Sequence, residues 1–184
     1  MTPPSYIMPL CVALPLGGAF VTALLGRRFP ALAPLLGTVA SALLLAISLL
    51  SVKVLLQHGV LVYTVGGWPP PVGISMVLDG LTAFMLVTVN LVAFLVVIFC
   101  LDYVNQFTAR SSFYVLFLLM VTGMNGVIVT GDLFNLFVFL EVAAVASYGL
   151  VAFGMEKHAL EAAFKYAVMG SVGSLCILLG IAML

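Results

Sequence analysis

The chain has 184 residues, of which 65% are hydrophobic and only 7% are charged, and its formal net charge at pH 7 is zero. A soluble domain carries about 25% charged residues, and a chain this short cannot hide so much apolar surface from water. The composition therefore excludes an ordinary soluble domain, and the balanced charge offers no basic surface to nucleic acid. We expect an integral membrane protein with lipid around most side chains.

Polar segments divide the sequence into six apolar stretches, each near the length of about 20 residues that a helix needs to cross a bilayer. The predicted spans are 7–25, 32–56, 77–101, 113–129, 133–153 and 159–184. We expect them to form one transmembrane domain over residues 1–184, without a soluble domain. The first stretch is expected to be a true helix and not a signal peptide, because no Lys or Arg precedes it.

The longest connection, residues 57–75, contains Gly66, Gly67, Trp68 and three consecutive prolines, 69–71. Proline cannot continue a helix, so we expect an extended or turn-rich surface loop. Trp68 is the only tryptophan, and interfacial tryptophans typically lie at the headgroup level.

The positive charges outside the apolar stretches predict the orientation. Arg27, Arg28, Arg110 and Lys157 fall after the first, third and fifth spans, whereas Lys53 lies at the opposite end of the second span. Because cytoplasmic loops carry the excess of Lys and Arg, these loops are predicted to be cytoplasmic. A multi-pass protein of the cell (inner) membrane follows, with both termini on the outer side.

Glu141 lies well inside the fifth span, between two apolar runs. Placing a charged side chain at mid-membrane costs about 2.5–3.5 kcal/mol on insertion scales. A partner, water or protonation offsets that cost, and a low dielectric favours the protonated carboxyl. These are the properties of a proton-relay group, although a structural ion pair that fixes helix packing is the competing interpretation.

Lys165 is the second charge inside a span. It either faces a hydrated track in the bundle, or extends towards the interface and pairs with Glu161 one turn earlier. Asp79 and Asp132 stand at predicted helix starts, where a carboxylate caps the helix, and Asp132 is also a candidate ion-entry group. Asn125, inside the fourth span, is expected to bond across helices.

The remaining reactive residue types give no site. Cys11, Cys100 and Cys176 lie apart in apolar runs, so we expect three small buried side chains and no disulfide framework. His58 and His158 stand at span ends without a second ligand at a metal spacing. No nucleotide site, nucleophile arrangement or haem-ligating pair is present. We therefore expect no metal, no cofactor and no redox chemistry, which means a transport subunit and not an enzyme.

Three runs of sequence carry a resemblance: Gly-Met-Asn-Gly at 123–126, Thr-Gly-Asp-Leu-Phe-Asn-Leu-Phe-Val-Phe-Leu-Glu at 130–141, and Ala-Ser-Tyr at 146–148. They closely resemble the fourth-to-fifth helix signature of antiporter-like membrane subunits. That family includes the D-type subunits of Mrp-type multisubunit Na⁺/H⁺ antiporters, matching subunits of membrane-bound hydrogenases, and proton-pumping subunits of respiratory complex I. Segments 66–69, 79–81 and 163–166 resemble the Mrp D-type version.

The resemblance implies an all-α membrane fold that matches the N-terminal six helices of a fourteen-helix core, in which ten helices form two inverted repeats. It implies that the glutamate matching Glu141 pairs with a lysine of the seventh helix at the start of a half-membrane proton channel. The basic residue matching Lys165 is implied to lie close to that pathway. Asp132, Asn125, Tyr148 and Glu161 are the candidate supporting residues.

The sequence stops after the sixth span, and three explanations stay open. It is a fragment of a longer gene product, a split subunit completed by another chain, or a reduced paralogue that supports assembly. Because inverted repeats place the ion site between repeat elements, other membrane subunits are expected as partners. Our preferred prediction is a subunit, or part of one, of an H⁺-coupled Na⁺ or K⁺ antiporter or a related ion pump. The alternative is a non-conducting structural subunit of a hydrogenase or complex I-like redox complex.

Overall fold

The computed structural model describes residues 5–68, 72–104 and 110–184. Within these ranges, six helices are long and apolar enough to cross a membrane. They are α1 (Ile7–Arg28), α2 (Leu32–His58), α3 (Gly80–Tyr103), α4 (Arg110–Val129), α5 (Leu133–Val151) and α6 (Lys157–Ala182). The predicted multi-pass helical fold is confirmed, and each helix begins and ends within one helical turn of the predicted span.

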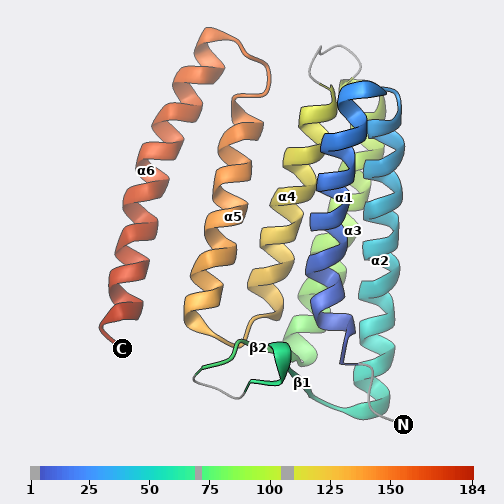
Figure 1. Cartoon of the computed structure of the whole chain (residues 1–184), viewed down its shortest axis with the longest axis vertical. Coiled ribbons are helices and arrows are strands. Elements are labelled where there is room, and N and C mark those ends of the chain that lie inside the picture. The colour runs from blue at the N-terminus through green and yellow to red at the C-terminus, as the bar shows by residue number, and fades with distance from the viewer. Residues whose placement is uncertain (1–4, 69–71, 105–109) are drawn as a thin grey trace.

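The helices run side by side, and the two ends of the bundle differ (Figure 1). The α1–α2 and α5–α6 connections lie at one end. The start of α1 and the end of α6 lie at the other end, together with a small hairpin. The first and last helix ends therefore share a side, as six spans require, while the assignment of that side to the cell exterior stays a prediction.

The hairpin is the element that the sequence did not predict. Strands β1 (Leu61–Thr64) and β2 (Ser75–Leu78) pair antiparallel, and a short 3₁₀ turn, η1 (Val65–Gly67), follows β1. Gly66 and Gly67 both have positive φ, a conformation that glycine adopts without strain. The connection is thus more ordered than the loop expected over 57–75. The predicted role of the prolines at 69–71 lies outside the described residues.

The third span begins later than expected. Val77 and Leu78 belong to β2, and α3 starts only after Asp79, whose side chain caps the helix by accepting a bond from the Thr82 backbone N–H at 2.8 Å. Hydropathy cannot separate the apolar strand from the apolar helix that follows it, which explains the early boundary. The predicted capping role of Asp79 is confirmed.

Replacing Asp79 with Ala is expected to loosen the first turn of α3 by about 1 kcal/mol, the typical value of an N-cap. The Thr82 N–H holds the pKa of Asp79 below its ordinary value of 3.8. Since the folded pKa is the lower one, the carboxylate's contribution is complete above pH 3.8 and is lost as the pH falls through the folded value. The rate of backbone hydrogen exchange in residues 79–83, followed as a function of pH, measures both the loss of the cap and its dependence on acid. Asp79→Asn should keep the cap but lose its acid dependence; equal exchange in Asp79→Ala and the parent chain would contradict the assignment.

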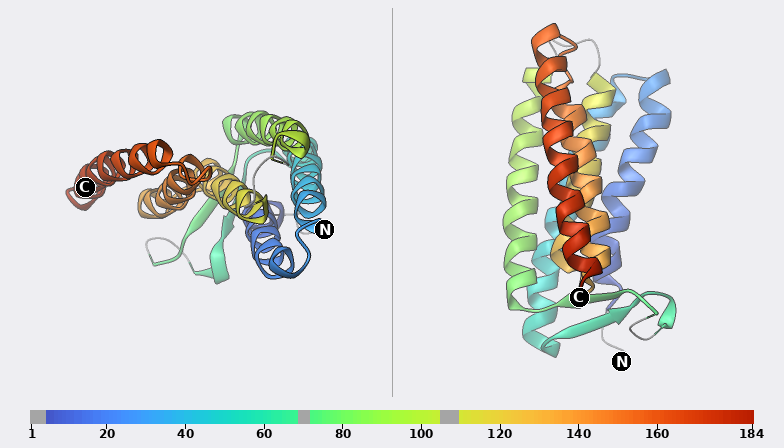
Figure 2. Two further views of the ribbon diagram at one scale, coloured as in Figure 1. Left: turned by 90° about the horizontal axis from the view of Figure 1, so that it is seen from above. Right: turned by 90° about the vertical axis from the view of Figure 1, so that its left-hand side faces the viewer.

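Burial is uneven across the bundle. Helices α1 to α4 pack around one another, α5 packs on α4, and the main contacts of α6 in the described chain are with α5. Figure 2, seen from above, shows α5 and α6 extending away from the four-helix group. This arrangement corrects one expectation: Cys11 and Cys100 are buried as predicted, but Cys176 is exposed, because it lies on the helix at the edge of the bundle, which packs mainly on α5.

Candidate functional site

The start of α5 is fixed by a capping network. Asp132 accepts a hydrogen bond from the Asn135 backbone N–H at 2.7 Å, and the Asn135 side chain donates to the Thr130 hydroxyl at 2.9 Å. The adjoining Gly131 N–H donates to the Ser75 carbonyl of β2 at 2.8 Å, which ties the hairpin to this turn. The predicted cap at Asp132 is confirmed, and its role in ion entry stays a prediction.

Glu141 lies two turns further along α5, beside a groove between α4 and α5. The groove has a volume of about 480 Å³, and it is lined by Leu116 and Leu119 of α4 and by Phe137, Val138, Glu141, Val142, Val145 and Ala146 of α5. One carboxylate oxygen, Oε1, is buried and has no hydrogen-bond partner among the described residues. Burying a polar atom without a hydrogen-bond partner costs free energy, so Oε1 marks a position that favours a polar or cationic partner.

Helices α4 and α5 approach each other closely at the position of Glu141. A Cβ on Gly123 of α4 would lie 2.5 Å from the backbone nitrogen of Ala143 and 2.7 Å from the carbonyl oxygen of Phe139, and a Cβ on Gly126 would overlap the Phe139 ring. Phe139 and Ala143 stand two residues on either side of Glu141. The glycines therefore set the distance between α4 and the part of α5 that holds the carboxylate.

Tyr148 links this part of α5 to α6. It lies two turns after Glu141, near enough for the two groups to interact electrostatically. Its ring packs edge-on against Tyr166 with centroids 4.8 Å apart, and its hydroxyl lies against Gly170, where any Cβ would collide with it. Gly170 thus allows a close approach of α5 and α6.

Lys165 and Glu161 are paired with each other. The Lys165 ammonium donates to the Glu161 carboxylate at 2.6 Å, and their side chains are 71% and 56% exposed. The structure therefore shows the one-turn pair that the sequence left as one of two alternatives. It does not bring Lys165 to Oε1 of Glu141, which has no hydrogen-bond partner in the described residues.

A buried polar network crosses the four-helix group. Asn125 donates to the Cys11 carbonyl at 3.1 Å and exchanges two 3.1 Å hydrogen bonds with Asn90 of α3, which also donates to the Ser48 hydroxyl at 2.8 Å. The expectation that Asn125 bonds across helices is correct. Asn90 and Ser48 were not predicted as members of this network, although an amide in the middle of the apolar third span was a usable signal.

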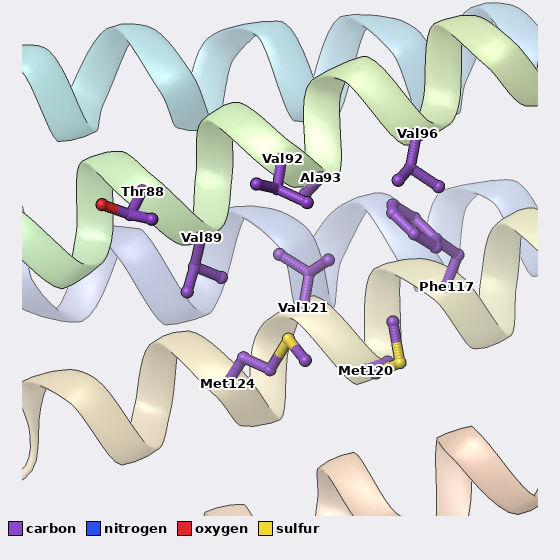
Figure 3. A pocket seen from close by; sticks show the side chains of 9 residues that line it. All are labelled: Thr88, Val89, Val92, Ala93, Val96, Phe117, Met120, Val121 and Met124. Carbon is purple, nitrogen blue, oxygen red and sulfur yellow. The ribbon is translucent and has the colours of Figure 1, made fainter.

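A second groove contrasts with the Glu141 groove. It lies between α3 and α4, has a volume of about 290 Å³, and is lined almost entirely by apolar side chains, with Thr88 as the one polar member. Figure 3 shows valines, methionines and Phe117 converging on it. No charged group lines it, so it offers nothing for ion transfer. Within the described residues, no group of three or more His, Cys, Asp or Glu side chains is placed to hold a metal ion.

Comparisons with known proteins agree with the helical membrane fold. Residues 101–184 match the family model described as NADH dehydrogenase I, subunit N related protein. The D-type subunit of a probable K⁺/H⁺ antiporter of Rhizobium meliloti is 32% identical over 184 residues, covering 97% of this chain and 34% of that protein. The structure of an archaeal membrane-bound sulfane sulfur reductase, a respiratory membrane complex, contains a chain that superposes with a TM-score of 0.89 at 33% identity, over 96% of this chain and 36% of that one.

The chain belongs to the antiporter-like family of membrane subunits. An NADH-quinone oxidoreductase subunit N of Desulforudis audaxviator, in the same family, is 41% identical over 121 residues, which are 65% of this chain and 24% of that protein. This antiporter-like chain thus spans between a quarter and about a third of the length of these relatives. The six-helix fold and the resemblance predicted from the fourth-to-fifth helix signature are both confirmed.

Proposed function

We propose that this antiporter-like chain forms part of an ion-translocating membrane complex and that Glu141 accepts and releases the transported proton. The complex is an H⁺-coupled Na⁺ or K⁺ antiporter or a related ion pump of the cell membrane. The observation that supports the proposal is the buried Oε1 of Glu141, which lies beside an apolar groove with no hydrogen-bond partner among the described residues. A structural carboxylate at this depth would be expected to have a partner.

The chemistry follows from charge and dielectric. Without a nearby cation the apolar groove favours the neutral acid, so Glu141 takes up a proton. A basic group brought close to Oε1 stabilises the carboxylate and favours proton release. Another membrane subunit, or a further segment of the same polypeptide, is the source of that group in this proposal. The chain performs no redox chemistry itself.

Lys165 has an accessory role in this proposal. Its ammonium is held by Glu161 on the exposed side of α6, and Tyr148 and Tyr166 stand between α6 and the helix of Glu141. If the Lys165 ammonium moved from Glu161 to an acidic group of another subunit, the electrostatic potential along the proposed proton pathway would change. Asp132, at the outer start of α5, is the proposed point of ion entry.

The alternative function is that of a non-conducting structural subunit, and the exposed Lys165–Glu161 pair is the observation that favours it. The two functions differ in one experiment. Replacing Glu141 with Gln keeps the shape of the side chain but removes the transferable proton. Loss of transport with normal assembly supports the ion-translocating role. Unchanged transport contradicts it and favours the structural role.

A further inference from the structure

Pro15 creates an unmet hydrogen-bonding need inside α1. Proline has no backbone N–H, so it cannot donate to the carbonyl of Cys11 four residues earlier, as other helix residues do. Cys11 is fully buried at membrane depth, where no solvent replaces the lost donor. Proline is tolerated in membrane helices when a neighbouring helix satisfies the freed backbone group. Here the Asn125 side-chain amide of α4 donates to the Cys11 carbonyl at 3.1 Å.

Asn125 is itself held on its other side. Its second N–H donates to the Asn90 side-chain oxygen, and its own oxygen accepts from Asn90, both at 3.1 Å. Asn90 also donates to Ser48 of α2 at 2.8 Å, and these three side chains are no more than 1% exposed. The Asn125 amide thus has all its hydrogen-bonding groups engaged and joins α4 to α1 and α3, with α2 linked through Asn90.

The same turn of α4 carries the contact with α5. Gly123 and Gly126 are three residues apart, so they share one side of the helix, and the 100° step per residue places Asn125 on roughly the opposite side. The glycine side lies against Phe139 and Ala143, which flank Glu141. The rotation of α4 that satisfies Asn125 is therefore the rotation that presents the glycines to α5.

We propose that Asn125 is a positioning residue for Glu141. By satisfying the carbonyl that Pro15 frees, it fixes the rotation of α4, and this rotation sets the groove around the Glu141 carboxylate. The inference rests on the proposed function for its transport consequence. The coupling between Pro15 and Asn125 stands independently of that function, because it depends only on which donor the Cys11 carbonyl has.

The test is a double-mutant cycle in the intact complex, in membrane vesicles. Asn125→Leu removes the donor, whereas Pro15→Ala gives the Cys11 carbonyl its ordinary helix N–H again. We expect Asn125→Leu alone to lower the transport rate about 10-fold and to shift the pH of half-maximal transport, because the surroundings of Glu141 change. Asn125→Leu also removes the two hydrogen bonds with Asn90, and Pro15→Ala does not replace them. We therefore expect the Pro15→Ala/Asn125→Leu double variant to recover the part of the rate and of the pH shift that comes from the Cys11 carbonyl, so that its loss is clearly smaller than that of Asn125→Leu alone. Thr88→Val, which removes a hydroxyl bonded only within its own helix turn, is the control and should change neither.

The outcomes separate the two claims. An unchanged pH profile in Asn125→Leu, or equal loss with and without Pro15→Ala, would overturn the positioning inference even if Glu141→Gln abolishes transport. If Glu141→Gln retains transport, the proposed function fails. The double-mutant cycle is then measured by the thermal stability of the purified complex, where Asn125→Leu should lower the melting temperature less when Pro15→Ala is present. If Asn125→Leu does not accumulate in the parent chain, accumulation only with Pro15→Ala supports the coupling. If Asn125→Leu accumulates neither alone nor together with Pro15→Ala, the cycle is repeated with Asn125→Ala. A loss of transport or of thermal stability that is the same with and without Pro15→Ala would then contradict the inference.

Discussion

Proton transport by the assembled complex is expected to fall by about 10²-fold or more when Glu141 is replaced with Gln, the scale of losing a positioned proton-transfer group. Glutamine fills the same space beside the α4–α5 groove and tolerates the apolar surroundings, so assembly should be normal. What it lacks is a proton that can be released. Ion-driven proton movement in everted vesicles, followed with a pH-sensitive dye, measures the change.

Glu156→Gln is the matched control for that experiment. Glu156 is exposed, directly precedes α6, and makes no capping bond with its side chain. The same chemical change there should leave transport as it is. Glu141→Asp keeps a carboxyl group on a shorter stem, and intermediate transport is expected. Full transport by Glu141→Gln at normal complex levels would contradict the role of Glu141 and favour the structural-subunit alternative.

Gly123→Ala is expected to destabilise the complex by about 1–3 kcal/mol, the cost of overpacking a close contact. The new methyl group would lie 2.5 Å from the Ala143 nitrogen and 2.7 Å from the Phe139 oxygen, and both are backbone atoms. No change of side-chain rotamer relieves such a collision, so α5 must move away from α4. Because the displaced segment carries Glu141, transport should fall together with stability.

Gly17→Ala on α1 is the control for the glycine experiment. A Cβ there meets no atom within 4 Å, so the substitution should be neutral, or stabilising by up to about 1 kcal/mol, since Ala is the better helix former. The melting temperature of the purified complex compares the two variants. An equal melting temperature for Gly123→Ala and Gly17→Ala would show that α5 does not pack on α4 as described.

Some features of this region can be predicted from the sequence because they are local. Glu141 stands out because a lone charge in an apolar span needs a physical reason, and the helix caps at Asp79 and Asp132 follow from residue type and position. Each of these signals is local, so neighbours along the chain are enough to recognise it. The six spans follow in the same way from length and hydropathy.

Features that depend on which helices meet are not visible in the sequence. Pro15 and Asn125 can each be noticed, but Asn125 reaches a carbonyl 114 residues earlier in the chain, and that pairing needs the rotation of two helices. The exposure of Cys176 depends on the number of neighbours of α6. The hairpin was missed because only Asp79 and Gly80 separate the apolar residues of β2 from the apolar residues of α3.

The protonation of Glu141 is the central claim, and infrared difference spectroscopy of the purified complex between acidic and alkaline pH tests it most directly. A protonated carboxyl in apolar surroundings gives its own C=O stretching band, distinct from that of a carboxylate. We expect a band that appears on acidification in the parent and Glu156→Gln complexes and is missing from the Glu141→Gln complex. Identical difference spectra for the parent and Glu141→Gln complexes would contradict it.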